Sequence, residues 1–271
     1  MPKALINEVT IHYESYGSGF PLILAYGLGG NTGQWQPQIS ALSEGRRLIL
    51  WDPRGHGQSE SPSRRDQYSL DISAEDLLGL MDHLNLPKAY VGGLSMGGAI
   101  ATRFTLAHPE RVAALLIIDS ATASGIPLPT AVRASLEKNV ELADTQGMEA
   151  VADHAIAASP NIAARVRQGP EAVRAIRKVI VGNSPVGYSN TIQAILASDS
   201  ITDRLPQIKA PTLVLVGDED TALPAAHVTH ERIASSELVI IPDAGHLSNL
   251  EQPSAFNRAM LMFLAEVDAQ R

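Results

Sequence analysis

The sequence predicts an α/β fold in which helices flank a mostly parallel sheet and an all-helical cap is inserted between two strands. Three observations support this prediction. Short apolar runs alternate with helical patterns along both ends of the chain. The runs are apolar at nearly every position, which is typical of parallel strands covered on both faces. Between about Ser120 and Ser200 the strand pattern stops, and prolines interrupt short alanine-rich segments.

The size and composition of the chain fit this fold. The chain has 271 residues, of which 45% are hydrophobic, enough for one large domain with an insertion. Its formal net charge of −8 repels phosphate backbones, so we expect no nucleic-acid partner. The absence of cysteine excludes disulfides, thiolate metal sites and a cysteine nucleophile.

The N-terminal residues carry polar side chains every few positions and lack the apolar core of a signal peptide. No run approaches the roughly 20 apolar residues that a membrane helix needs. We therefore expect a cytoplasmic protein with no membrane partner. Nothing in the sequence specifies an oligomeric state.

The N-terminal half supplies the first strands and helices. Alternation predicts an exposed hairpin strand, apolar runs predict buried strands, and helical spacing predicts helices that end before Pro or Gly. The predicted strands are Val9–Glu14, Leu22–Tyr26, Arg47–Asp52, a short strand from Tyr90, and Ala114–Asp119, and the predicted helices are Ser69–Leu86 and Ala99–Ala107.

The C-terminal part returns to the α/β pattern after the insertion. Strands are predicted over Pro211–Gly217 and Leu238–Ile241, and a final helix over Ser254–Val267. We therefore predict a core formed by residues 1–120 and 201–271, and a helical cap formed by residues 121–200.

A candidate nucleophile lies between the short predicted strand from Tyr90 and the predicted helix Ala99–Ala107. Residues 93–97 read Gly-Leu-Ser-Met-Gly and fit G-x-S-x-G between a strand and a helix. A serine on such a sharp turn is held in strained backbone geometry at the positive end of a helix, and flanking glycines remove the Cβ atoms that would collide. We predict that Ser95 is a nucleophile.

A serine hydroxyl needs a base within hydrogen-bond reach. His246 follows the last predicted strand, in the segment Asp-Ala-Gly-His, where a loop residue can point over the sheet edge. The other histidines lie in a hairpin, in a turn, on or beside helices, or in the insertion, where surface or structural roles are expected. We predict that His246 is the base.

The base needs an acid that holds its tautomer, and the loop after the strand Pro211–Gly217 offers two. We choose Asp220, because the intervening turn lets the chain fold back toward His246. Asp218 stays open as an alternative, although a turn-capping role fits it better. Asp119, at the end of the strand before the insertion, is a further candidate.

An acyl-transfer intermediate needs two backbone N–H donors. Met96 follows the nucleophile, and Leu28 lies in the glycine loop after the first buried strand, so we predict both as oxyanion donors. The loop does not fit the dinucleotide pattern G-x-G-x-x-G, because Thr32 occupies the third glycine position. No metal-ligand cluster is evident, and we expect neither metal nor cofactor.

Two aromatic residues and one turn lie near these groups. We predict that Tyr26, in the glycine loop, contacts substrate. We predict the same for Trp35, which follows the loop closely enough to line a pocket, with a position in the core as the alternative. The turn Asp52–Ser59 combines glycines with charged groups, and we interpret it as a structural, hydrogen-bonded turn.

These motifs together resemble those of capped α/β-hydrolases. The resemblance rests on the glycine loop followed by Trp35, on D-x-R-G-H-G-x-S at 52–59, on G-L-S-M-G-G at 93–98, and on the segments around Asp220 and His246. It extends over nearly the whole chain outside the insertion and is greatest to 3-oxoadipate enol-lactonase-like proteins and carboxylesterases. The family usually has His-Gly where this chain has Tyr26-Gly27. Branches with an aspartate nucleophile are disfavoured, because position 95 is Ser.

The sequence therefore predicts a cofactor-free hydrolase that cleaves a small-molecule carboxylic ester or lactone through an acyl-enzyme. Two alternatives stay open: a carbon–carbon bond hydrolase or perhydrolase with the same three residues, and a small-molecule sensor without turnover.

Overall fold

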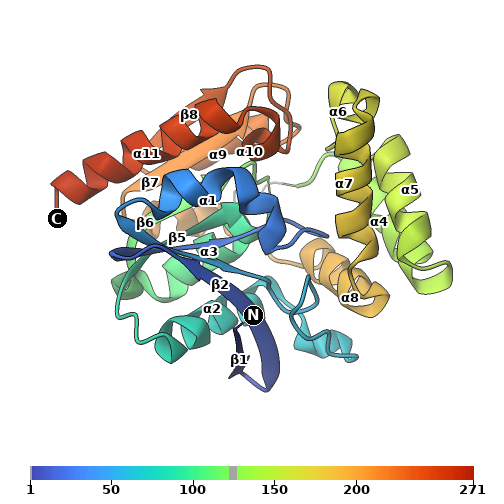
Figure 1. Ribbon diagram of the computed structural model, residues 1–271, viewed down its shortest axis with the longest axis horizontal. Helices are drawn as coiled ribbons and strands as arrows, with labels where there is room; N and C mark the ends of the chain where they lie inside the picture. Colours follow the sequence, from blue (N-terminus) through green and yellow to red (C-terminus); the bar gives the residue numbers. More distant parts are fainter. Residues whose placement is uncertain (1, 122–126) are drawn as a thin grey trace.

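The computed structural model describes residues 2–121 and 127–271, and it contains a sheet of eight strands in the order β1-β2-β4-β3-β5-β6-β7-β8 (Figure 1). β1 and β2 join the sheet antiparallel, and all later strands run parallel. The strands are β1 (Lys3–Ile6), β2 (Val9–Tyr16), β3 (Phe20–Ala25), β4 (Arg46–Trp51), β5 (Ala89–Leu94), β6 (Val112–Ile118), β7 (Thr212–Gly217) and β8 (Ser236–Ile241).

The strand order reverses direction beside β3, and this places two loops next to each other. β3 pairs with β4 on one side and with β5 on the other. The loops that follow β3 and β5 therefore leave the same edge of the sheet at a topological switch point, where open α/β sheets bind ligands. The glycine loop and Ser95 are the residues that occupy these two loops.

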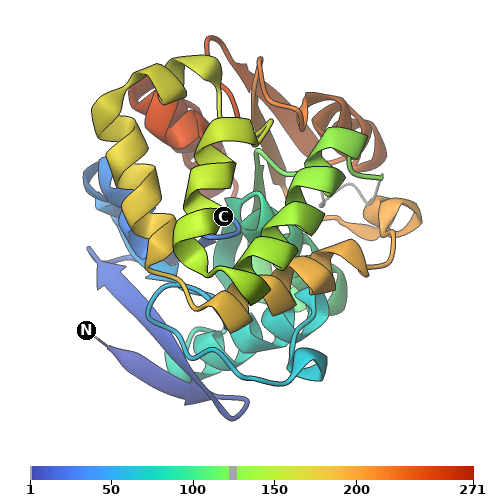
Figure 2. The ribbon, with the colours of Figure 1, turned by 90° about the vertical axis from the view of Figure 1, so that its right-hand side faces the viewer.

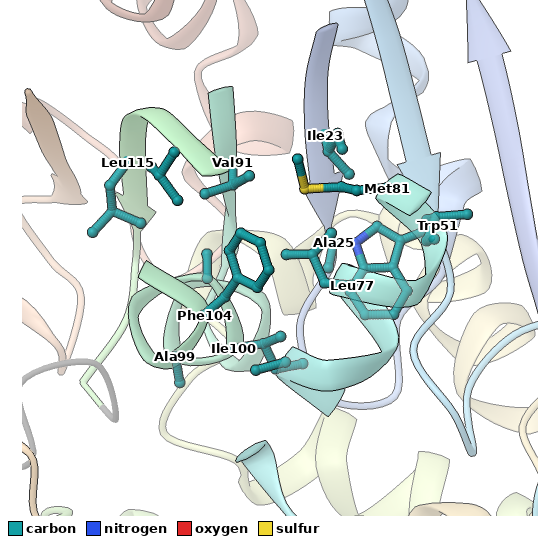
Figure 3. Packing of buried hydrophobic residues seen from close by; sticks show 14 of the residues in the cluster. Ile23, Ala25, Trp51, Leu77, Met81, Val91, Ala99, Ile100, Phe104 and Leu115 are labelled. Atoms are coloured by element: carbon teal, nitrogen blue, oxygen red, sulfur yellow. The ribbon is translucent and has the colours of Figure 1, made fainter. Parts of the chain in front are cut away.

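Alternating residues of the strands form two apolar layers. One face packs against α2 (Leu70–His83), α3 (Met96–Ala107) and α9 (Leu223–Arg232), and the other packs against α1 (Gln36–Ser43) and α11 (Pro253–Ala269). Figure 3 shows the first layer, where Ile23 and Val91 of the sheet face Met81 of α2 and Phe104 of α3. The near-continuous apolar strands are required because both faces are covered.

Helix α2 illustrates how the sequence sets these elements. Ser69 precedes the helix, and its hydroxyl accepts a hydrogen bond from the Ile72 amide, which satisfies one free N–H of the first turn. Leu70, Leu77 and Leu80 recur on one side and are buried against the sheet.

Five helices are inserted between β6 and β7, and no strand occurs among the described residues of this segment. They lie beyond the carboxyl ends of the parallel strands (Figure 1). Figure 2, turned by 90°, shows them in front of the sheet. We call them the inserted helices: α4 (Thr130–Thr145), α5 (Met148–Ala158), α6 (Ala164–Gln168), α7 (Pro170–Val181) and α8 (Pro185–Leu196).

Every predicted strand and helix is present with its ends shifted by a few residues, and the predicted fold class is confirmed. No bounds were predicted for β1, α1, α9 or the short helix α10 (Ser248–Glu251). The four residues of β1 are too few for a clear alternation, and α1 and α9 are short helices that each carry a proline at the second position. Four further short segments, at 32–35, 65–67, 109–111 and 202–207, form 3-10 turns.

Candidate active site

Ser95 lies at the sharp turn between β5 and α3, in a backbone conformation that residues other than glycine rarely adopt. Its φ is 55° and its ψ is −113°. Its N–H donates to the Ile118 carbonyl at 2.7 Å, and its carbonyl accepts from the Ser120 hydroxyl at 2.6 Å. These bonds hold the strained residue, with its side chain at the N-terminal end of α3, where the helix dipole favours developing negative charge.

The flanking glycines of the turn are required by close packing. A Cβ atom at Gly93 would lie 2.4 Å from the Ala25 carbonyl oxygen, and a Cβ atom at Gly97 would lie 2.3 Å from the same atom. Real Cβ contacts do not come so close, so any other residue would push the end of β3 away from the turn. The G-x-S-x-G pattern is thus explained by the approach of β3 to both sides of Ser95.

The structure brings Ser95, His246 and Asp220 together from three loops. The Nε2 atom of His246 lies 3.0 Å from the Ser95 Oγ, and its Nδ1 lies 3.0 Å from both carboxylate oxygens of Asp220. With the imidazole proton on Nδ1, the ring donates to Asp220 and accepts from the serine hydroxyl. The arrangement is therefore competent to remove the hydroxyl proton.

The two carboxylates after β7 have different surroundings. Asp220 is 5% exposed, and besides His246 it accepts from the Ala222 amide at 3.0 Å. Asp218 instead accepts from the Ala244 amide at 3.2 Å, which ties its loop to the loop that carries His246. The structure thus places Asp220, and not Asp218, beside the imidazole.

Asp119, the further candidate, is buried close to these groups but binds elsewhere. Its carboxylate accepts from the Gly217 amide at 3.0 Å and from the Ser248 hydroxyl at 2.5 Å. Burial and the charge of Asp220 raise the pKa of Asp119 well above its ordinary value. Asp119 therefore connects the ends of β6 and β7 to α10.

The electrostatic surroundings favour the protonated imidazole. Burial acts to lower the pKa of His246, but the charge of Asp220 and its hydrogen bond outweigh it, with further help from Asp119 and Glu251. Together they raise the pKa from 6.5 to about 9. The site is thus suited to hold the proton that a serine would lose during attack.

Leu28 and Met96 lie with Ser95 in the wall of one cavity. Met96 is the first residue of α3, where backbone N–H groups have no partner within the helix. The glycine loop is supported from the inserted segment, because the Asn183 amide donates to the Gly29 carbonyl at 2.9 Å while its oxygen accepts from the Gly57 amide at 3.2 Å. Nothing in the sequence around Asn183 had indicated this contact.

The turn Asp52–Ser59 has the structural character expected of it. The Asp52 carboxylate accepts from the amides of Thr32 at 2.8 Å and Gln58 at 2.9 Å, so it connects the turn to the end of the glycine loop. Arg54 forms a buried ion pair with Asp76 of α2, with its Nε 2.6 Å from a carboxylate oxygen. None of these side chains lines the cavity.

The two aromatic residues predicted to contact substrate differ in position. Tyr26 lines the cavity, and its hydroxyl donates to Asn249 at 3.0 Å. The prediction for Trp35 needs correction: its side chain is 0% exposed and lies in the apolar layer under α11, against Tyr26 and Phe256, away from the cavity wall. Trp35 follows the glycine loop in sequence, but the short 3-10 turn Thr32–Trp35 directs its indole ring inward.

The cavity lies between the strand ends and the inserted helices and has a volume of about 160 Å³. Apolar side chains from α4 and α7, among them Val132, Leu136 and Ile176, form much of its wall opposite Ser95. Two sequence-distant contacts join this wall to the loops below it: the Asn183 contact and an arginine bridge from α6.

The arginine bridge was not foreseen from the sequence. Arg165 of α6 places one guanidinium nitrogen 2.5 Å from Glu219 and the other 2.7 Å from Glu251. The other oxygen of Glu251 accepts from the amides of Gly245 and Leu247 at 3.2 Å, on either side of His246. The partners are far apart in sequence, so no local pattern could have revealed them.

Among the residues that the structure describes, no group of three or more His, Asp or Glu side chains is arranged to hold a metal ion. No helix of the described chain is long and apolar enough to cross a membrane.

Comparison with known proteins places this geometry in a family. Residues 21–253 match the family described as alpha/beta hydrolase fold. The chain is 30% identical over 260 residues to 3-oxoadipate enol-lactonase 2 of Acinetobacter baylyi, which covers 94% of this chain and 92% of the relative. Among solved structures it is similar to the enol-lactonase of Burkholderia xenovorans LB400, with a TM-score of 0.87, 32% identity and coverage of 97% and 100%. It is also similar to a thermophilic esterase of Thermogutta terrifontis, with a TM-score of 0.87, 29% identity and coverage of 98% of each chain.

Proposed function

We propose that this chain, which belongs to the alpha/beta hydrolase fold family, cleaves carboxylic esters or lactones of small molecules through an acyl-enzyme on Ser95. The relatives that it matches include hydrolases named enol-lactonase and esterase, which supports hydrolysis as the reaction class. The observation that carries the finer proposal is the distance of 3.0 Å between the Ser95 Oγ and the His246 Nε2, at a cavity wall.

The first half of the reaction forms the acyl-enzyme. The Ser95 Oγ attacks the substrate carbonyl carbon while its proton passes to the His246 Nε2. Asp220 stabilises the imidazolium through Nδ1, and the N–H groups of Leu28 and Met96 stabilise the negative oxygen of the tetrahedral intermediate. The imidazolium then gives its proton to the alcohol oxygen as the carbon–oxygen bond breaks. For a lactone, the leaving oxygen stays attached to the acyl chain.

The second half releases the acid. Neutral His246 removes a proton from a water molecule while the water oxygen attacks the acyl carbon. The proton then passes from His246 to the Ser95 Oγ as the bond between the enzyme and the acyl group breaks. Every step uses groups of the chain and water, so the proposed reaction needs no added cofactor.

We further propose that the core and the cap have different roles. Residues 1–120 and 201–271 form the catalytic core, and residues 121–200 form a cap that supplies the acyl-binding wall. The apolar cavity-lining side chains of α4 and α7 support this role.

Turnover of p-nitrophenyl esters by the purified protein and by Ser95→Ala tests the proposal. We expect the wild type to release p-nitrophenol with multiple turnovers and the variant to lose at least about 10⁴-fold in kcat/KM with an unchanged circular dichroism spectrum. Ser198→Ala, a serine whose hydroxyl only donates to the Ile195 carbonyl, is the control. Full activity in Ser95→Ala would overturn the proposal.

A further inference from the structure

The cavity wall contains no permanent charge among the described residues. Its lining includes His246 as the single side chain that carries a charge near neutral pH; the remaining polar side chains are neutral. Residues 122–126, which the structure does not describe, contain no charged side chain in the sequence. Besides Ser95, the neutral polar residues of the wall are Tyr26, Gln34, Ser135, Asn139, Ser159, Asn161, Tyr188 and Thr221.

Most of these polar groups are already engaged with one another. The Thr221 hydroxyl donates to the Asn161 side chain at 2.9 Å, and the Asn139 amide donates to the Tyr188 hydroxyl at 3.2 Å. The side-chain oxygen of Asn139 lies 2.8 Å from the Nδ1 atom of His154. The hydrogen-bond donors that these neutral side chains offer carry no charge, so they replace the water around a buried anion only in part.

The basic side chains of the inserted helices are held away from the cavity. On α7, Ile176, Val179 and Ile180 line the cavity, whereas Arg177, between them in sequence, pairs on the outside with Glu149 and Asp153 of α5. The helical period directs Arg177 to the side of α7 that faces α5 and the three apolar residues toward the cavity.

Two further arginines near the site are also engaged. Arg165 is shared between Glu219 and Glu251. Arg167 donates to the backbone carbonyls of Ile156 and Ser159. Neither guanidinium lines the cavity.

The charges behind the catalytic loops are mainly negative. Asp220 and Glu251 lie on the His246 side, and Glu219 lies beside them. A substrate carboxylate in the cavity would lose its hydration and would meet no cation except the His246 imidazolium, whose charge is already paired with Asp220. Burying a charge that has no free partner costs several kcal/mol.

We propose that this cavity selects uncharged esters or lactones with an apolar acyl part and rejects substrates that carry a free carboxylate on the acyl chain. The inference rests on the proposed function and specifies its substrate class. The mostly apolar wall favours binding of an apolar acyl part, and the absence of an unpaired cation disfavours a carboxylate.

A matched pair of substrates tests this inference. Methyl p-nitrophenyl adipate and mono-p-nitrophenyl adipate have the same acyl chain length and the same leaving group, but only the second carries a carboxylate. After subtraction of spontaneous hydrolysis at pH 8, we expect kcat/KM for the anionic ester to be at least about 100-fold lower. Values within about threefold of each other would overturn the inference while leaving the proposed function in place. A folded protein inactive on both would overturn the proposed function itself.

Variants that add a cation to the wall test the stated cause. Ser135 lies half-buried on α4 at the cavity, so Ser135→Lys introduces a charge on a flexible chain, and Ser135→Gln is the neutral control. We expect the lysine variant to reduce the discrimination to about tenfold or less and the glutamine variant to retain it. Val179→Lys against Val179→Met repeats the comparison on α7. If discrimination is unchanged in both folded lysine variants, the stated cause is wrong.

Discussion

The loops at the sheet edge and the inserted helices determine different properties of this protein. At the sheet edge, Ser95, Asp220 and His246 are held by backbone hydrogen bonds and by glycines that cannot be replaced without collision. The inserted helices meet the cavity with apolar side chains whose exact identity few hydrogen bonds constrain. Under the proposed function, the difference teaches that reaction type depends on short, geometrically demanding motifs, whereas substrate choice depends on the composition of a whole cavity wall.

The largest expected effect separates the two carboxylates after β7. Asp220→Asn should lower kcat by about 10⁴-fold, because an amide cannot hold the imidazole tautomer that accepts the serine proton. Asp218→Asn, which can still accept from the Ala244 amide, should stay within about tenfold of the wild type. Steady-state kinetics of both variants decides the assignment. Equal losses would mean that Asp220 has no special role.

The next effect concerns stability and contrasts a core ion pair with one on the inserted helices. Asp76→Ala should lower the free energy of unfolding by about 3–5 kcal/mol, since it leaves Arg54 buried without its partner. Glu149→Ala, which removes an exposed partner of Arg177, should change it by less than about 1 kcal/mol. Urea denaturation measures both. Comparable changes would show that the burial difference does not control the energetics.

The arginine bridge couples the two regions and predicts a smaller kinetic effect. Glu251→Ala should lower kcat about 10–100-fold, because the amides of Gly245 and Leu247 lose the acceptor that orients His246. Glu251→Gln keeps an acceptor and loses only the charge toward Arg165, so its kcat should fall less than about fivefold.

These two variants also separate positioning from folding. Both variants remove the Glu251 charge that helps raise the pKa of His246, so both should shift the pH profile toward lower pH. A merely structural role would lower stability without lowering the maximal kcat of the folded enzyme, whereas positioning of His246 predicts a lower maximal kcat in Glu251→Ala and its recovery in Glu251→Gln. If Arg165→Ala loses as much activity as Glu251→Ala, the charge pair, and not the amide contacts, matters most.

The pH dependence of activity follows from the raised pKa of His246. The base must be neutral, so kcat/KM should increase with pH as the imidazole loses its proton, with an apparent pKa near 9. An activity profile that is complete by pH 7 would contradict this electrostatic account.

The pH dependence of stability should have the opposite direction. Because the folded pKa of about 9 exceeds the unfolded value of 6.5, the stabilising contribution of His246 is fully present below about pH 6.5 and is lost as the pH rises through about 9. His246→Gln should remove this part of the dependence in thermal unfolding followed between pH 6 and 10.

The grouping of Ser95, Asp220 and His246 could be predicted from sequence because its signals are local. The turn at Ser95 needs glycines at 93 and 97, and the loops after the last two strands each present a polar residue at the same edge. Choosing Asp220 over Asp218 rested on how far the chain must fold back, and the structure places Asp220 beside the imidazole.

Other features depend on packing that a sequence pattern does not contain. Trp35 was expected at the cavity, but its ring is buried against Tyr26 and Phe256. Asn183 and Arg165 act across long sequence separations, and each lies in a segment with no motif. The lack of charged side chains in the cavity wall likewise becomes evident only when α4 and α7 are placed over the strand ends.

Covalent trapping tests the central claim, that Ser95 is the nucleophile, most directly. The protein is incubated with diethyl p-nitrophenyl phosphate, and the released p-nitrophenol, the intact mass and the labelled peptide are measured. We predict one equivalent of p-nitrophenol, one diethylphosphoryl group on the peptide containing Ser95, and neither in Ser95→Ala. A label on another residue, or inactivation of the wild type without modification of Ser95, would contradict the account.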